Sequence, residues 1–343
     1  MDELKKERIA IEIIKTLRSR FESFPEDASD NRNAPFHEAF LEAFRIKIEK
    51  YVTDIPIFVS LASWMHGLNT TLGQSFFEKV AHILCDGEKK KFTNLKVTLG
   101  QQAKISEIIA GLKNKTRLPS LSKENTEIAQ SKEKIFVDAP NFSADVYYEE
   151  DDNLVLIELK TVKPNSDVFK EQKNKFLYSK AALNNIHPKA KILFYLGFPF
   201  DPLNEQKIGF DKTRFMNYSV DFKKYFASEE VLLADELWDY LSQEKNTMQL
   251  ILSIINKIAK PDFIEKYDFI NEPKNRIVAK EKYNNILNEW FLQREVRLMK
   301  SYDQLNKLAV GNKNIQRLLS QNLFDTQHEY KETRITSLLN YRE

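Results

Sequence analysis

The chain has 343 residues, of which 42% are hydrophobic, so it is long enough for one large folded domain or two smaller ones. Its 52 basic residues nearly cancel its 50 acidic ones, and the formal net charge of +2 identifies no polyanionic ligand. The single cysteine, Cys85, excludes an internal disulfide framework and argues against a structural zinc site. We therefore expect a cytoplasmic protein, and a nucleic-acid ligand only if charge is locally concentrated.

The amino terminus is charged and amphipathic, without the apolar core and cleavage site of a secretory signal. The most apolar stretch, Ile55–Leu68, is shorter than the roughly 20 residues that cross a bilayer. It predicts a buried helix, and we expect no membrane association.

The amino-terminal half predicts mostly helices. Apolar residues at near-helical spacing predict a first helix around residues 9–21, and Ser75–Leu84 predicts another. The alternating pattern of Lys91–Gly100 predicts a strand. The polar, lysine-rich stretch 101–131 predicts an insertion with a short helical pattern near its start.

Two runs rich in β-branched and aromatic residues, FSADVYY and LVLIELKTV, follow, separated by the acidic turn EEDDN. They predict a β-hairpin, followed by a helix over 166–184 and a strand over 190–200. The segment 201–225 predicts a loop region that could read bases. The chain beyond about residue 229 has helical patterns throughout. We predict a helical segment over 1–54, a core of mixed α/β class over 55–228 and a mainly helical region over 229–343.

The second strand of the hairpin carries the chemistry. Its alternating side chains are apolar on both faces, which predicts a covered central strand, yet it ends with Glu158 and Lys160 on one face. Asp145 lies on the preceding strand, and closure of the hairpin brings it beside Glu158. Two carboxylates therefore converge next to one lysine.

Two carboxylates, with the remaining ligands left to water and phosphate, suit Mg²⁺, for which Mn²⁺ could substitute. Such an ion stabilises charge that builds up on a phosphate, while Lys160 positions or deprotonates the attacking water. We predict a metal-dependent nuclease with Asp145, Glu158 and Lys160 in its active site. The alternative is a buried structural ion pair, since Glu-x-Lys also occurs at Glu3, Glu88, Glu171 and Glu205.

Asp145, a spacer and Glu158-Leu159-Lys160 resemble the motif of the PD-(D/E)xK nuclease superfamily, with Ala144 in place of the motif's proline. The shared core covers about residues 70–200 and implies a central mixed sheet flanked by helices. NTTLGQSFFEKVA (Asn69–Ala81) and IELKTVKPN (Ile157–Asn165) together resemble type II restriction endonucleases of the TdeIII-like group.

The resemblance implies Glu78 as a further metal ligand on the helix before the sheet. It also implies cleavage of double-stranded DNA to 5′-phosphate and 3′-hydroxyl ends by a homodimer, at a short interrupted palindrome such as GGNCC, with a cognate methyltransferase protecting the host. Two alternatives keep the same fold: a structure-specific repair or recombination nuclease, and a DNA-binding protein that does not cleave.

Lysines crowd the end of the motif strand and the next helix, where their charges could contact phosphates. The candidates for nucleic-acid binding are Lys163, Lys170 and Lys173, together with Gln172, which could orient a site residue; the alternative is a solvated helix face. His66 and His82 are expected to make single structural hydrogen bonds.

Overall fold

The computed structural model describes residues 1–25, 41, 46, 50, 55–160, 166–218 and 220–341. The chain divides into two compact units: residues 1–76 with 251–343, called here the helical unit, and residues 77–250, called the sheet unit. These boundaries differ from the predicted ones at 54/55 and 228/229. Helical periodicity indicates which face of a helix is buried, but not which other helix it packs against.

The sheet unit is built on a mixed five-stranded sheet with the strand order β1-β4-β5-β6-β7. The strands are β1 (Glu88–Phe92), β4 (Phe142–Glu150), β5 (Asn153–Leu159), β6 (Lys191–Phe198) and β7 (Val231–Leu233). β4 pairs antiparallel with β1 and β5, while β6 pairs parallel with β5 and β7. The predicted hairpin and the predicted central position of its second strand are both confirmed.

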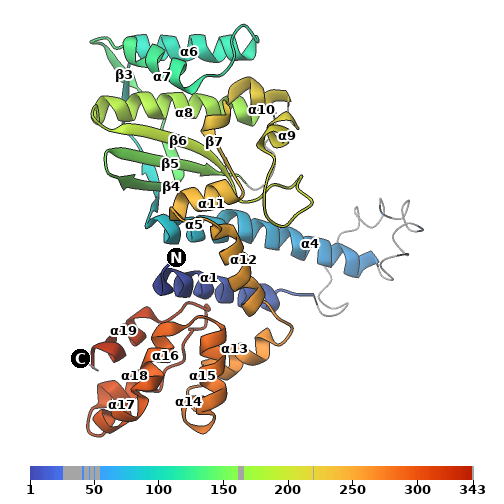
Figure 1. The fold of residues 1–343 in the computed structure, drawn as a ribbon, viewed down its shortest axis with the longest axis vertical. Coiled ribbons are helices and arrows are strands. Elements are labelled where there is room, and N and C mark those ends of the chain that lie inside the picture. The colour runs from blue at the N-terminus through green and yellow to red at the C-terminus, as the bar shows by residue number, and fades with distance from the viewer. Residues whose placement is uncertain are drawn as a thin grey trace. The chain divides into compact units, whose positions relative to one another are not determined.

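Helices cover both faces of this sheet (Figure 1). α8 (Ser166–Ile186) lies on one face, where Phe176 stacks on Phe194 of β6 with ring centroids 3.9 Å apart. α5 (Phe77–Cys85) and α11 (Asp235–Ser242) lie on the other. The indole of Trp238 on α11 donates a hydrogen bond of 2.8 Å to the carbonyl of Pro199. The predicted fold class, a mixed sheet flanked by helices, is confirmed.

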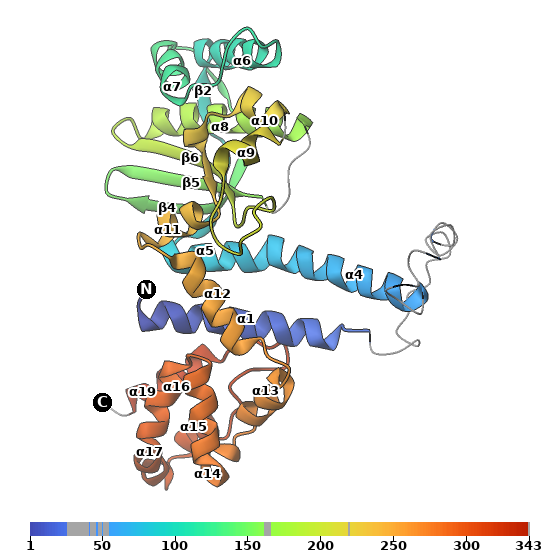
Figure 2. The same ribbon diagram turned by 45° about the vertical axis from the view of Figure 1, so that its right-hand side comes forward.

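The stretch predicted as one strand and an insertion forms a more regular structure. β1 ends at Phe92, and β2 (Lys96–Thr98) pairs with β3 (Phe136–Asp138) in a separate two-stranded sheet. Thr98 then starts α6 (Leu99–Lys113), because its side chain and that of Gln101 form a reciprocal capping box. α6 and α7 (Leu121–Gln130) lie on the side of α8 away from the sheet (Figure 2).

The segment predicted as a loop region after β6 is also partly helical. It contains α9 (Lys212–Asn217) and α10 (Val220–Tyr225), followed by η3 (Ser228–Glu230) and β7. The buried Asp201 organises the loop before α9 by accepting backbone hydrogen bonds from Leu203 and Asp211. The sequence does not predict α9 and α10, because six residues are too few to show a clear helical repeat of apolar positions.

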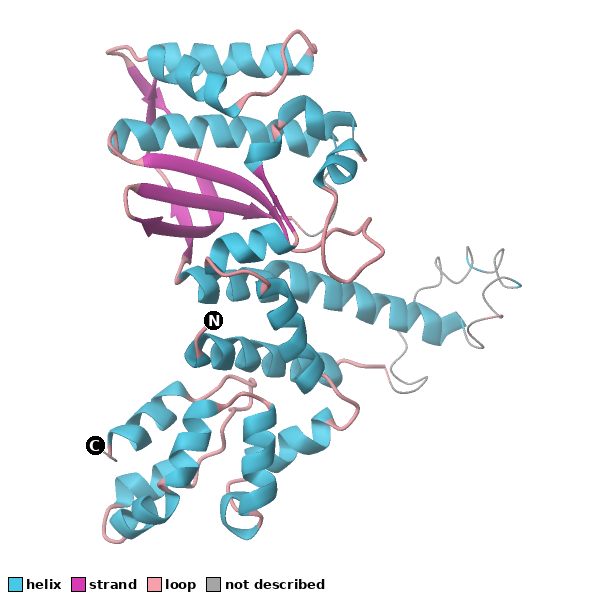
Figure 3. Cartoon of the chain, in the orientation of Figure 1, coloured by secondary structure: helices cyan, strands magenta, loops and turns pink. Residues whose placement is uncertain are grey.

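In its described part, the helical unit contains helices and one isolated β-bridge (Figure 3). Its amino-terminal elements are α1 (Glu3–Glu22), α4 (Ile55–Thr71) and the π-helix η2 (Leu72–Phe76). Most described α4 residues are half-buried or exposed, whereas the sequence predicted a buried helix. α12 (Thr247–Ile258) crosses the boundary between the units. The remaining helices are α13 (Phe263–Asn271), α14 (Asn275–Val278), α15 (Lys280–Glu289), α16 (Gln293–Lys300), α17 (Tyr302–Ala309), α18 (Lys313–Leu319) and α19 (Glu332–Asn340). No helix in the described ranges is both long and apolar enough to cross a membrane.

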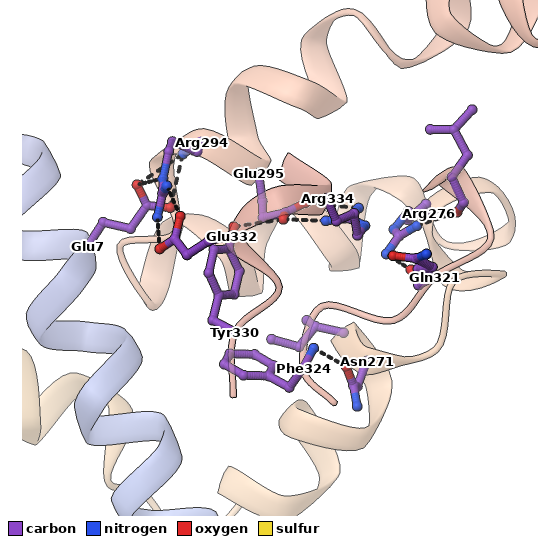
Figure 4. Close-up of polar contacts among 12 residues, drawn as sticks. Glu7, Asn271, Arg276, Arg294, Glu295, Gln321, Phe324, Tyr330, Glu332 and Arg334 are labelled. Atoms are coloured by element: carbon purple, nitrogen blue, oxygen red, sulfur yellow. Dashed lines mark hydrogen bonds and ion pairs between the residues drawn. The ribbon is translucent and has the colours of Figure 1, made fainter. Parts of the chain in front are cut away.

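Charged side chains, several of them buried, connect the helices of this unit (Figure 4). Glu295 accepts hydrogen bonds from Arg334 at 2.6 Å and from the hydroxyl of Tyr330 at 2.8 Å. Burial raises the pKa of Glu295, but the nearby Arg334 and Arg276 outweigh this effect and leave it below the ordinary value. Arg294 joins Glu7 of α1 to Glu332 of α19. The network therefore fixes how α1, α16 and α19 pack.

A second buried ionic cluster lies in the sheet unit and corrects one of the predictions. The ammonium of Lys173 on α8 lies 2.6 Å from a carboxylate oxygen of Glu124 and 2.7 Å from one of Glu230. All three side chains are almost completely buried. The predicted contact of Lys173 with nucleic acid is therefore wrong for this structure, because helical spacing turns the side chain inward.

Replacing Lys173 with Met should lower the free energy of unfolding by about 3–5 kcal/mol, because two buried carboxylates lose their main counter-ion. Urea unfolding measures this change. Lys170→Met is the matched control, since Lys170 lies on the same helix but is exposed, and it should change stability by less than about 0.5 kcal/mol. Equal effects of the two substitutions would contradict a structural role for Lys173.

Candidate active site

The hairpin places Asp145 and Glu158 opposite each other, as predicted. The register pairs Val146 with Ile157, so the next opposed residues toward the open end of the hairpin are Asp145 and Glu158, on the same face of the sheet. The backbone N–H of Leu159 donates a hydrogen bond of 2.9 Å to Oδ2 of Asp145. The Asp145 side chain therefore reaches across to the end of β5.

Two lysines bind the carboxylate of Glu158. Lys160 Nζ lies 2.7 Å from Oε1, and Lys175 Nζ of α8 lies 2.6 Å from Oε2. The backbone N–H of Lys160 donates to the carbonyl of Gly197 at the end of β6, at 2.9 Å. The motif lysine is thus held at the point where the parallel strands β5 and β6 end.

Glu78, on α5, is connected to this pair through Lys89 of β1. Lys89 Nζ lies 2.9 Å from Oε2 of Glu78 and 3.6 Å from Oδ1 of Asp145. Within the described ranges, no three His, Cys, Asp or Glu side chains are close enough together to form a metal-binding group. Asp145 and Glu158 face each other across the hairpin, and Glu78 is joined to Asp145 only through Lys89.

Two carboxylates lie close together at the site, with lysines beside them. Burial and then the charge of Glu158 raise the pKa of Asp145, although the Leu159 N–H and the charges of Lys160 and Lys89 oppose them. The hydrogen bond with Glu78 raises the pKa of Lys89. A cation bound beside Asp145 would oppose the effects of burial and of Glu158 that raise this pKa.

The donor atoms fit a divalent cation. Oδ1 of Asp145 and the carboxylate of Glu158 are hard oxygen ligands of the kind that Mg²⁺ and Mn²⁺ accept, while phosphate and water would complete the shell. The Nε2 atom of His82 lies 2.7 Å from the backbone carbonyl oxygen of Asp145, so its hydrogen bond is made to the main chain, as expected for a structural histidine.

The candidates for nucleic-acid binding have different surroundings. Lys163 lies outside the described residues. Lys170 is exposed on α8 and remains available to a phosphate, whereas Lys173 is buried in the ionic cluster. Gln172 is half-buried, and its Oε1 atom is buried without a hydrogen-bond partner among the described residues.

The sequence does not identify Lys89 and Lys175 as partners of the site carboxylates, and it indicates Lys175 only as one of the lysines that crowd the helix after the motif strand. Lys175 follows Glu158 by 17 residues on a helix with several other lysines, so nothing in the spacing distinguishes it. Lys89 lies on an edge strand that was predicted to begin two residues later. A correct start for β1 would have indicated it, because β1 pairs with the strand that carries Asp145.

Comparison with known proteins decides what kind of enzyme carries this arrangement. The family model described as "Type II restriction endonuclease, HinfI" matches residues 1–259. The chain belongs to this family. It is also 44% identical over 353 aligned positions to the type II restriction enzyme MjaII of Methanocaldococcus jannaschii, covering 97% of this chain and 95% of the relative. No solved structure matches the chain.

Membership of the HinfI family confirms the prediction of a type II restriction endonuclease, that is, a site-specific deoxyribonuclease of a restriction-modification system. The matching model names the HinfI family, whereas the sequence motifs indicated the TdeIII-like group. Family membership also favours site-specific cleavage over the two alternatives, a repair nuclease and a non-cleaving binding protein. Enzymes of this class generally use divalent metal ions.

Without a metal ion, Asp145→Asn should raise the free energy of unfolding by about 0.5–2 kcal/mol, because it removes a buried charge next to Glu158. The folded state holds the Asp145 proton more tightly than the unfolded state does. Wild-type stability therefore falls as pH rises from the ordinary pKa through the raised one. The gain should be absent below the ordinary pKa and largest above the raised pKa.

Urea unfolding in chelator at pH 3.5 and pH 7.5 measures this difference. Asp138→Asn serves as the control, since Asp138 is exposed, and should be neutral at both pH values. A loss of stability in Asp145→Asn at pH 7.5 would mean that the surrounding lysines already stabilise the Asp145 charge fully.

Proposed function

We propose that this restriction endonuclease hydrolyses double-stranded DNA with Mg²⁺ and leaves 5′-phosphate and 3′-hydroxyl ends. The observation that carries the proposal is the opposition of Asp145 and Glu158 across the hairpin, with Lys160 bound to Glu158. Asp145 and Glu158 are the proposed metal ligands, and Glu78 is a third candidate through its connection by Lys89. Mn²⁺ should replace Mg²⁺, because both accept carboxylate oxygens.

In the proposed reaction, Asp145 and Glu158 would hold the cation, which would stabilise the negative charge that develops on the phosphate. Lys160 orients the attacking water and takes part in removing its proton. The bond from the water oxygen to phosphorus forms, and the bond from phosphorus to O3′ breaks. O3′ then takes a proton from solvent, which gives the 3′-hydroxyl end. The exposed Lys170 binds a neighbouring phosphate.

Plasmid cleavage tests the proposal directly. Purified enzyme with Mg²⁺ should convert unmodified plasmid to discrete fragments, and chelator should abolish cleavage. Asp145→Ala and Lys160→Ala should each lower the cleavage rate by at least about 10²-fold, because each removes a group that acts at the phosphate. Lys134→Ala, in an exposed loop of the same unit, should leave the rate unchanged.

The ends of the fragments report the end chemistry and the recognition sequence. Ligation and sequencing should give 5′-phosphates at one short repeated sequence, for which GGNCC is the first to examine. Full activity of Asp145→Ala, or cleavage in chelator, would contradict the proposed site. A palindromic target is cut in both strands, so we propose a homodimer with one active site for each strand. We also propose a cognate methyltransferase that modifies the same sequence and so protects the host DNA.

Removing the charge of Lys170 should weaken binding to duplexes of any sequence. The slope of log affinity against log salt concentration should become less negative by about one, because one phosphate contact is lost. Fluorescence anisotropy with a labelled duplex in Ca²⁺ buffer measures the slope for wild type and Lys170→Ala. Lys134→Ala is the control, and an unchanged slope in Lys170→Ala would assign Lys170 to solvent alone.

A further inference from the structure

The three lysines of the site differ in how they hold the carboxylates. Lys160 and Lys175 each bind a separate oxygen of Glu158 at hydrogen-bonding distance, and their side chains are 24% and 19% exposed. Lys89 instead bridges Glu78 and Asp145, and its side chain is 53% exposed. Lys89 therefore loses the least on leaving, because its ammonium remains close to water.

The position of Lys89 matters more than its exposure. Oδ2 of Asp145 accepts the Leu159 N–H, so Oδ1 has more lone-pair capacity left for a cation. The Lys89 ammonium approaches this oxygen at 3.6 Å and also binds Glu78. A cation that binds Oδ1 of Asp145 thus encounters a positive charge already in place.

The backbone around Lys89 is also irregular. β1 is an edge strand of the sheet, and its register with β4 shifts between Glu88 and Lys90. A shift of this kind aims a side chain differently from a regular strand position. The irregularity coincides with the residue whose ammonium turns toward two acidic side chains.

We propose that Lys89 is an internal competitor of the metal ion: it neutralises Asp145 and Glu78 in the metal-free enzyme and must leave Asp145 before the cation binds. This inference rests on the proposed metal site. Lys89 lowers the affinity of the free enzyme for divalent cations while holding the carboxylates in place. Lys89 is thus a positioning residue, which acts through Asp145 and Glu78 and determines the cation concentration at which the site is filled.

Titration with Mn²⁺ alone, followed by the electron paramagnetic resonance signal of the free ion, tests the proposal. Lys89→Met should bind Mn²⁺ about three- to tenfold more tightly than wild type, because the competing charge is gone. Lys91→Met is the matched control. Lys91 lies on the same strand, is exposed, and makes no ion pair with the described residues, so its replacement should leave the affinity unchanged.

Thermal unfolding gives a second readout that does not depend on cleavage. Saturating Mn²⁺ should raise the unfolding temperature more in Lys89→Met than in wild type, since tighter binding stabilises the folded state further. Unchanged or weaker Mn²⁺ binding in Lys89→Met would overturn the proposal. An equal gain in Mn²⁺ affinity in Lys89→Met and Lys91→Met would also overturn the proposal. The gain would then come from the lower overall positive charge of the strand, and not from the loss of competition for Asp145.

Asp145→Asn separates this inference from the function on which it rests. Loss of Mn²⁺ binding in that variant, with no effect of Lys89→Met, would leave the metal site intact and reject the role of Lys89. Binding that persists undiminished in Asp145→Asn would reject the metal site itself.

Discussion

Asp145 and Glu158 can lie opposite each other at the end of two largely buried strands because positive charge surrounds them. Lys160 and Lys175 each bind one oxygen of Glu158. The Leu159 N–H donates a hydrogen bond to Asp145, and the Lys89 ammonium lies near its other oxygen. Without these partners, two carboxylates on one face of a covered sheet would repel each other with little water to screen them. The hairpin, α8 and β1 therefore together supply the positive charge that two adjacent carboxylates require.

A different solution to buried charge appears away from this site. Lys173 and Lys180 pair with Glu124 and Glu230, and Glu295 pairs with Arg334, where these side chains are almost inaccessible to solvent. These ion pairs hold helices in place, and their carboxylates are already occupied by lysine or arginine side chains. At the site, Asp145 also has a raised pKa, because it is buried and lies beside Glu158. The structural carboxylate Glu7 has a raised pKa as well, so the opposition of Asp145 and Glu158 across the hairpin distinguishes the site, and the pKa direction does not.

The hairpin could be predicted because its signal is local: two β-rich runs, an acidic turn and a doubly apolar strand that ends in Glu158 and Lys160. Lys89 and Lys175 could not, since each reaches the carboxylates only through strand pairing or helix packing. The sequence does not predict β7, because a run of three apolar residues is too short to show the alternation that is typical of a strand. The inward position of Lys173 depends on which face of α8 meets η3, and that is decided by tertiary packing.

The strand that supplies Lys89 has a further consequence for the molecule. β1 has the sequence Glu-Lys-Lys-Lys-Phe along an edge of the sheet, and the opposite edge, β7, is only three residues long and buried. Consecutive lysines on an open edge repel a second strand that would otherwise hydrogen-bond to it, and a very short strand offers little to pair with. Both margins of the sheet are thus guarded against intermolecular strand addition, so the lysines of β1 also keep separate copies of the enzyme from aggregating edge to edge.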